Sequence, residues 1–349
     1  MTKFALALTA LALPSFAFAQ TETPAPSPNQ IVEEAQENEW VSISVEDLLV
    51  MRLAPDAEGN PREVIIQLMP APFSQGWVDN IRLLARDGWY DGISVNRVQD
   101  NYVVQWGDPN YDNPESDGET KPLPEGLKVM GENEYAASHD AVNKAGLYAQ
   151  ATAFWNSFYE IYRERSGDLR SGEKGPNFGK DSYAISAGFG KGWPFALNDT
   201  IANPVHCYGM VGVGRNYSPD TGSGAELYTV IGHAPRHLDR NIALVGRIIE
   251  GMEHLSSLPR GNGTLGFYAE FERDKRTPIL SIDVASDLLE SDDEPAGLTY
   301  AYEYLSTESE SFALYAEARA NRRDPFFIYP AGGADICNIP VPVRPAPNG

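Results

Sequence analysis

The sequence predicts a mainly β protein, a barrel or sandwich that is interrupted by insertions. Two observations favour this class. Short runs of β-branched and aromatic residues recur between clusters of Gly, Pro, Asn and Asp, and stretches with helical periodicity are few. The 349 residues, 42% of them hydrophobic, are enough to bury the core of one large domain or two small ones.

The first predicted element after a polar N-terminal stretch is a β-hairpin. Alternating apolar residues from Val41 to Met51 form one extended run, VIIQLM at residues 64–69 forms the next, and turn residues at 56–61 separate them. Apolar residues at helical spacing then predict a helix between Phe73 and Asp87, which Gly88 ends. Strands are predicted again around residues 93–95 and 102–104.

The middle of the chain, residues 110–203, is predicted to be a largely helical and irregular insertion. Residues 108–131 form a polar loop rich in Pro and Gly, residues 136–163 have a helical composition, and residues 167–192 are Gly-rich and irregular. Further strands are predicted at residues 210–211, 227–231 and 242–249, and a late helix at 312–321. Residues 326–329 and 339–343 are candidate edge strands.

The N-terminus has the pattern of a bacterial export signal. A short basic start ending at Lys3 precedes an apolar run to Phe16, and Ala17 and Ala19 supply the small residues of a cleavage site. The sequence therefore predicts a signal peptide at 1–19, a Pro-rich linker at 20–39 with order beginning near Trp40, a main domain at 40–260 and a C-terminal extension at 261–349 that packs on it. We expect a periplasmic protein; an uncleaved anchor and secretion are the alternatives.

Charge and cysteine content limit the partners. Lys and Arg number 27 against 49 Asp and Glu, a net charge of −22. Nucleic acids and anionic membranes both bind to basic surfaces, so the acidic balance argues against either as a partner. No stretch after the signal is apolar enough to cross a membrane. Cys207 and Cys337 are able to pair in an oxidising compartment, with two separate thiols as the alternative. Two Cys and scattered His do not make a zinc pattern, and no cofactor is expected.

One arginine stands out in the segment from residue 83 to 109, LLARDGWYDGISVNRVQDNYVVQWGDP. Arg97 falls at the end of a predicted strand, and Gln105 falls on the next strand. An arginine near a core is costly to leave unpaired, and its planar fork of donors suits precise hydrogen bonding to a carbonyl or amide. We therefore expect a binding site centred on Arg97.

Two blocks of the sequence resemble the cyclophilin family of peptidyl-prolyl cis–trans isomerases. The first is GWYDG at residues 88–92 followed by RV at 97–98 and QWGDP at 105–109, and the second runs from Ala225 to Met252, AELYTVIGHAPRHLDRNIALVGRIIEGM. The resemblance covers roughly residues 40–254, with large insertions. It implies a closed antiparallel β-barrel capped by two helices, and a protein that binds proline-containing polypeptides.

The resemblance also implies roles for single residues. The catalytic arginine of the family falls on Arg97, and the pocket glutamine that would orient it falls on Gln105. The residues that bind the substrate then fall on Tyr102, Val103, Glu226, Tyr228, His237 and Leu238. The sequence departs from the family pattern at Val95–Asn96, at Ile242 and at Glu226, which stands where the family has glutamine.

Two functions follow from this reading. The first is an isomerase that assists the folding of exported proteins, in which Arg97 stabilises the twisted X–Pro amide. The second is a weakly active or inactive module that binds proline-containing peptides or a partner protein, with the insertion at 110–203 making contacts. The retained arginine favours the first function. Glu226, which we expect to pair with Arg97 and compete with substrate, favours the second together with Asn96 and the insertion.

Overall fold

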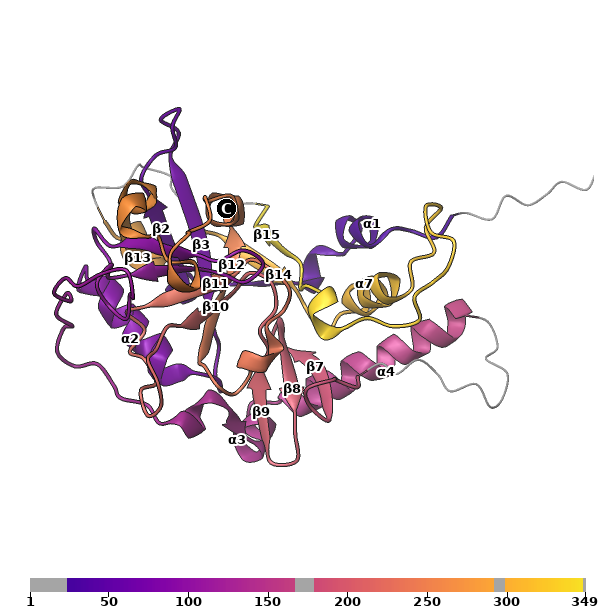
Figure 1. The fold of residues 1–349 in the computed structure, drawn as a ribbon. Helices are drawn as coiled ribbons and strands as arrows, with labels where there is room; N and C mark the ends of the chain where they lie inside the picture. Colours follow the sequence, from indigo (N-terminus) through magenta and orange to yellow (C-terminus); the bar gives the residue numbers. More distant parts are fainter. Residues whose placement is uncertain (1–23, 167–178, 292–298, 348–349) are drawn as a thin grey trace, which may run out of the picture.

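The computed structural model describes residues 24–166, 179–291 and 299–347 (Figure 1). The predicted signal peptide at 1–19 and the first residues of the predicted linker lie outside the described residues. In the part of the chain that is described, no helix is both long and apolar enough to cross a membrane.

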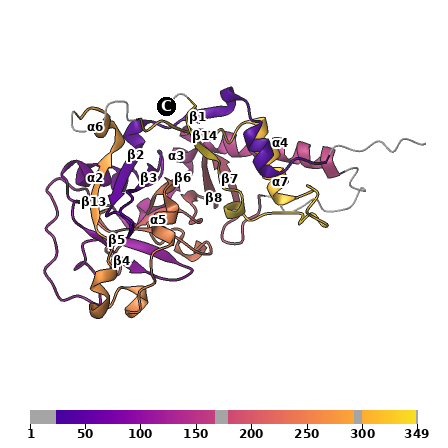
Figure 2. The same cartoon turned by 90° about the horizontal axis from the view of Figure 1, so that it is seen from above.

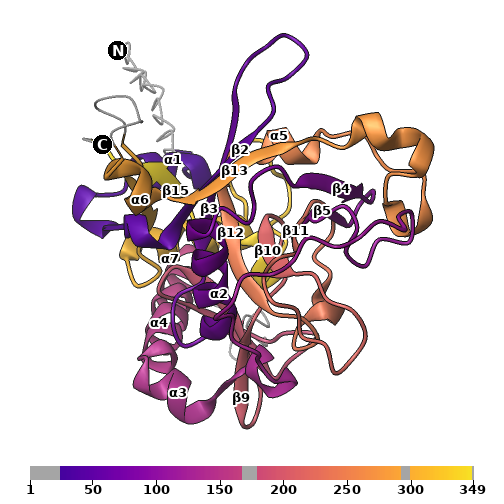
Figure 3. The ribbon, with the colours of Figure 1, turned by 90° about the vertical axis from the view of Figure 1, so that its left-hand side faces the viewer.

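The largest sheet is antiparallel and has eight strands. Figure 3 shows these strands next to one another. The ends of the sheet approach each other: the N–H of Val95 donates to the carbonyl of Thr277 (2.9 Å), and Ile279 donates to Ile93 (2.8 Å). The sheet is thus nearly closed into a barrel, and the predicted fold class is confirmed. In spatial order its strands are β13 (Ile279–Val284), β2 (Leu48–Leu53), β3 (Arg62–Leu68), β12 (Leu244–Glu250), β10 (Met210–Val213), β11 (Leu227–Val230), β5 (Val103–Gly107) and β4 (Ser94–Val98).

The alternation of side chains along each strand separates the barrel core from the outer face. On β5, Val104 and Trp106 point into the main hydrophobic core, while Val103 belongs to a separate cluster outside it. The predicted hairpin consists of β2 and β3. In the turn between them, the main-chain N–H of Asn60 donates to Oδ1 of Asp56 at 2.8 Å. Each barrel strand therefore contributes one row to the core and one to the outside.

Two helices pack on the barrel. The predicted helix is α2 (Gln75–Arg86), whose buried face includes Trp77, Ile81 and Leu84, and Gly88 follows it at a φ of 65°, which glycine adopts without strain. The second, α5 (Met252–Ser256), is short and buries Leu255. The arrangement agrees with a barrel capped by two helices.

The insertion contains a second sheet that the sequence analysis did not predict. Helices α3 (His139–Lys144) and α4 (Leu147–Ser166) are present as expected. The insertion also contains a four-stranded sheet, in the order β6 (Ala137–Ser138), β9 (Ile201–Pro204), β8 (Trp193–Leu197) and β7 (Ser186–Gly190). Strand β7 was not predicted because its glycines interrupt the alternation of side chains that indicates a strand. A Cβ on Gly188 would lie 2.8 Å from the Cβ of Ala151, so glycine lets α4 lie close to the sheet.

The chain termini form a third layer beside the insertion. A small sheet joins β1 (Trp40–Ser42), β14 (Tyr302–Leu305) and β15 (Val343–Pro345), while α1 (Pro28–Glu33) and α4 both pack on α7 (Glu310–Ala320), as Figure 2 shows. The predicted start of order near Trp40 is therefore wrong. Ser27 caps α1, and Ile31 is buried in the core, so residues assigned to a linker are folded.

Two further predictions need correction. The main domain does not end at residue 260, because β13 is an edge strand of the barrel sheet and pairs with β2. Residues 326–329 form no strand, and only Val343 of the candidate strand at 339–343 belongs to β15. The late helix is confirmed as α7, and α6 (Ala285–Leu289) follows β13. Cys207 and Cys337 form a disulfide with Cα atoms 5.1 Å apart, which joins the C-terminal segment to the loop before β10.

Candidate functional site

The strand register aligns four residues in one row across the outer face of the barrel. Arg97 on β4 lies opposite Gln105 on β5, Gln105 lies opposite Tyr228 on β11, and Tyr228 lies opposite Gly212 on β10. Residues in such a row are direct cross-strand neighbours. A Cβ on Gly212 would lie 2.3 Å from the Tyr228 hydroxyl, so the glycine makes room for the ring. The sequence separates these residues widely, and the sheet brings them together.

A cleft of about 710 Å³ opens over this row. Its apolar part, the pocket floor, consists of Tyr228 and Val103, both nearly fully buried, with Leu238 and Ile242 packed at its side. Leu238 comes from a short 3-10 turn, Arg236–Leu238, that follows β11. A compact apolar ring fits such a floor better than an extended polar side chain does.

Arg97 forms one side of the cleft and lies near two aromatic rings. Its guanidinium carbon lies 5.5 Å from the ring centre of Tyr102 and 5.5 Å from that of Phe267. Its Nε donates to the carbonyl of Leu265 at 2.7 Å. We call Arg97, Tyr102, Leu265 and Phe267 the arginine wall. Burial lowers the pKa of Arg97, although a guanidinium remains charged at physiological pH.

The terminal nitrogens of Arg97 have neutral partners. Nη1 donates to Oε1 of Gln105 at 3.2 Å, and Nη2 donates to Oε1 of Gln99. No carboxylate forms an ion pair with Arg97 among the residues that the structure describes. Three of the five guanidinium N–H groups are engaged by Leu265, Gln105 and Gln99, and one on each terminal nitrogen remains to face a ligand.

Glu226 does not pair with Arg97, and that prediction is wrong. The loop after β5 covers Glu226, and the N–H of Asp108 donates to its Oε1 at 2.6 Å, while Gln105 contacts its carboxyl group. The side chain is 3% exposed and fills the space over Gly107, where a Cβ would lie 2.1 Å from the carboxyl group. Burial raises the pKa of Glu226 well above its usual range, which favours the neutral form of this carboxyl group behind the cleft.

The other predicted residues lie at the rim and in the cleft. His237 is exposed and its ring lies parallel to that of Tyr102, with centres 6.4 Å apart. Tyr102, Val103, Gln105, Tyr228 and Leu238 all line the cleft, whereas His237 and Glu226 do not. The structure therefore brings six of the eight predicted residues into one cleft, with His237 at its edge.

Sequence reasoning missed the residues that hold this site. Phe267 and Leu265 lie in the region assigned to the C-terminal extension, and Leu265 is 168 positions from the arginine that it binds. The cleft is also lined by Asp112, from the loop after β5, and by Arg215 and Tyr217, from the loop between β10 and β11. No local sequence pattern marks any of these residues as part of a site.

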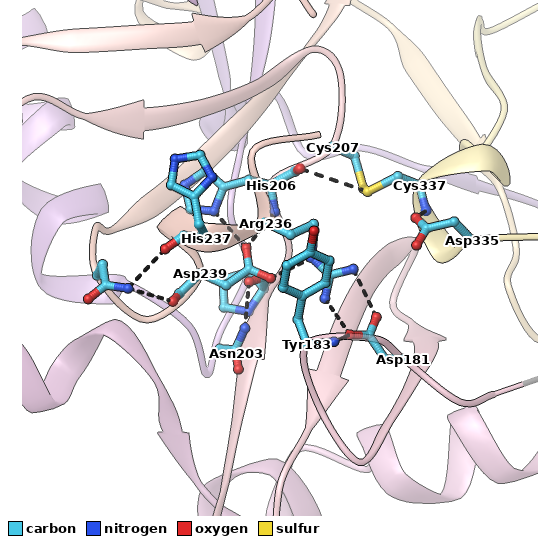
Figure 4. A network of polar contacts seen from close by, with 12 residues as sticks. Asp181, Tyr183, Asn203, His206, Cys207, Arg236, His237, Asp239, Asp335 and Cys337 are labelled. Atoms are coloured by element: carbon cyan, nitrogen blue, oxygen red, sulfur yellow. Dashed lines mark hydrogen bonds and ion pairs between the residues drawn. A yellow bond between two sulfur atoms is a disulfide. The ribbon is translucent and has the colours of Figure 1, made fainter. Parts of the chain in front are cut away.

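A buried polar network contacts the hydroxyl group of Tyr228, and Figure 4 shows its members His206, Asp239, Arg236 and Asp181. His206 contacts the Tyr228 hydroxyl through Nε2 at 2.9 Å and Asp239 Oδ1 through Nδ1 at 2.8 Å. Arg236 donates through Nε to Asp239 Oδ2 at 2.6 Å and forms two bonds to Asp181, at 2.8 and 3.0 Å. Among the described residues, no group of three or more His, Cys, Asp or Glu side chains is arranged to hold a metal ion.

Comparison with known proteins finds one family model and several solved structures that resemble this chain. Residues 63–282 match the model of the cyclophilin type peptidyl-prolyl cis-trans isomerase/CLD family. The crystal structure of a cyclophilin from Hirschia baltica is similar at a TM-score of 0.56 and 18% identity, covering 89% of this chain and 97% of that one. A cyclophilin type isomerase from Cryptosporidium parvum, solved with the dipeptide Ala-Pro, is 11% identical with a TM-score of 0.33, covering 67% of this chain and 98% of that one. No curated protein matches the chain.

Proposed function

The chain belongs to the cyclophilin-type peptidyl-prolyl cis–trans isomerase family, and on that premise we propose that it catalyses X–Pro isomerisation in exported proteins. The observation that carries this proposal is the row of Arg97, Gln105 and Tyr228 across three neighbouring strands. It sets a fixed cation and an apolar floor on one face of the sheet, with Gln105 between them as the cross-strand neighbour of both. The predicted export signal supports the choice of exported substrates.

The chemistry to be accelerated is rotation about an amide bond. Resonance of the nitrogen with the carbonyl creates a barrier of roughly 18–20 kcal/mol, and the uncatalysed exchange takes tens to hundreds of seconds. In the twisted state the prolyl nitrogen regains its lone pair and becomes a hydrogen-bond acceptor. A donor aimed at that nitrogen stabilises the twisted state more than either planar state, which is the condition for catalysis.

Different residues of the cleft would bind the proline ring and stabilise the twisted amide. The pocket floor would hold the pyrrolidine ring, and Arg97 would donate one of its two remaining N–H groups to the prolyl nitrogen. Because Leu265, Gln105 and Gln99 already engage the other donors, the guanidinium does not need to reorganise during the reaction. No covalent intermediate forms, and proton transfer is not required.

The test is an exchange assay on an Ala-Pro peptide with wild-type protein and two variants. Removing one fixed electrostatic donor costs about 10²–10³-fold in rate, so we expect such a loss for Arg97→Ala. Arg97→Lys should recover little of it, because an ammonium group cannot serve three separate acceptors with the same planar fork. Arg273→Ala, an exposed arginine paired with Glu270, is the matched control and should keep the wild-type rate.

The same assay separates the two functions. Equal rates for wild type and Arg97→Ala would reject the role of Arg97. Peptide binding without acceleration by the wild type would reject the isomerase proposal, and would support a module that binds proline-containing segments.

A further inference from the structure

We propose that His206 is a positioning residue for the pocket floor, which it fixes by holding the hydroxyl group of Tyr228. The inference rests on the proposed function of the cleft, since it concerns how the proline ring is seated there. Tyr228 has two ends with different surroundings. Its ring lines the cleft, while its hydroxyl lies under Gly212 and contacts Nε2 of His206 at 2.9 Å.

The direction of this hydrogen bond follows from the other side of the imidazole. Asp239 Oδ1 accepts from Nδ1 of His206 at 2.8 Å, and also from the main-chain N–H of His206 at 3.0 Å. A carboxylate can only accept, so the proton of a neutral imidazole lies on Nδ1. The Nε2 atom is then an acceptor. Burial raises the pKa of Tyr228, which keeps its phenol protonated as the donor to His206.

Asp239 is itself fixed as a carboxylate. Burial opposes its charge, but the bonds from His206 and Arg236 prevail and lower its pKa. Arg236 in turn forms a paired contact with Asp181 in the insertion. Because His206, Arg236 and Asp239 are almost fully buried, each would be costly to leave unpaired, and with a neutral imidazole the network has one consistent set of donors and acceptors.

The main chain of His206 is also held. The next residue is Cys207, whose disulfide to Cys337 joins this loop to the C-terminal segment, and Cys337 Sγ lies 3.8 Å from the His206 carbonyl oxygen. The imidazole and the Tyr228 ring are parallel within 10°, with centres 6.3 Å apart. A bare phenyl ring would cover the same floor without this anchor. The hydroxyl group therefore serves to set the ring relative to Arg97 and Gln105.

A double-mutant cycle tests the inference through the binding of an Ala-Pro peptide. His206→Leu removes the acceptor, and Tyr228→Phe removes the donor while keeping the ring. A net hydrogen bond corresponds to about three- to tenfold in an equilibrium, so each single change should weaken peptide binding by about that factor. In the Tyr228→Phe background, His206→Leu should add little further loss. His206→Gln should restore binding, because its amide oxygen can accept from the phenol.

The outcomes distinguish this inference from the proposed function. Equal losses from His206→Leu with and without the Tyr228 hydroxyl would overturn the positioning role, even if isomerase activity is present. Peptide binding is measured directly, so the cycle can be read even if the wild type shows no turnover.

A second measurement needs no substitution and guards against variants that fail to fold. The ¹⁵N chemical shifts of His206 in the wild-type protein should report a proton on Nδ1 and an unprotonated Nε2. A proton on Nε2 would overturn the assigned direction of the hydrogen bond and with it the inference.

Discussion

The arginine wall and the pocket floor meet in one cleft but are stabilised in opposite ways. Arg97 is a charged group whose partners are all neutral: two glutamine side chains, a carbonyl and two aromatic rings. The floor is a neutral surface whose support is charged, because Tyr228 is anchored to His206, Asp239 and Arg236. The cation in the cleft makes no ion pair among the described residues and is attracted by Asp112 only through space, whereas the charges beneath the floor are paired directly.

This difference has a physical rationale. A carboxylate beside Arg97 would compete with a weak acceptor such as the prolyl nitrogen, whereas neutral acceptors orient the guanidinium and leave most of its field available. Beneath the floor the requirement is rigidity, and buried charges that are fully paired form a network with one arrangement. Altering the two regions separately should therefore produce different kinds of loss.

The largest expected effect comes from removing the disulfide next to His206, the residue that holds the pocket floor. Replacing both cysteines, Cys207→Ala with Cys337→Ala, should lower the free energy of unfolding by about 2–5 kcal/mol, because the disulfide closes a chain separation of 130 residues. Denaturant unfolding under oxidising conditions measures this change. Binding of the Ala-Pro peptide should weaken as well, while the arginine wall stays intact. A loss of stability with unchanged binding would show that the disulfide does not support the floor.

The contrast also explains what the sequence could predict. The barrel strands alternate regularly, and the motif around Arg97 lies within a single hairpin, so both could be inferred from local pattern. Leu265 and Phe267 could not, because they reach Arg97 from a turn far along the chain. Strand β7 escaped prediction because its glycines serve close packing of α4 and remove the side-chain alternation that marks a strand.

Glu226 illustrates a different limit. The resemblance assigns Glu226 to substrate binding and led us to expect a pair with Arg97, whereas its side chain bonds the main chain of Asp108 and does not line the cleft. The loop that begins at Asp108 folds over it and supplies a main-chain donor, so that the carboxyl group is buried behind the cleft, and this burial raises its pKa. Side-chain direction depends on what covers a strand, and the covering loop carries no sequence pattern of its own.

A smaller effect, with a defined sign, is expected from pH. Burial raises the pKa of Glu226 above its ordinary value of 4.5, so the folded protein keeps a proton that the unfolded chain releases. Stability is lost as pH rises from about 4.5 to the folded pKa, by up to about 1.4 kcal/mol per pH unit. Glu226→Gln should abolish this component and be more stable relative to wild type at pH 7 than at pH 4. Urea unfolding at the two pH values measures it, and an unchanged difference between them would contradict a neutral Glu226.

The smallest effect is expected at the rim of the cleft, at a residue that belongs neither to the arginine wall nor to the pocket floor. His237 is exposed, its side chain does not line the cleft, and it contacts Tyr102 only through a ring stack at 6.4 Å. An exposed aromatic contact is worth about 0.5–1.5 kcal/mol at most, so His237→Ala should change KM by less than about tenfold and leave kcat unchanged. The same kinetic assay applied to Leu238→Ala, the adjacent residue that does line the cleft, provides the matched comparison and should show the larger rise in KM. If His237→Ala lowered kcat instead, the ring stack would have to position Tyr102 against Arg97, and the arginine wall would extend to the rim.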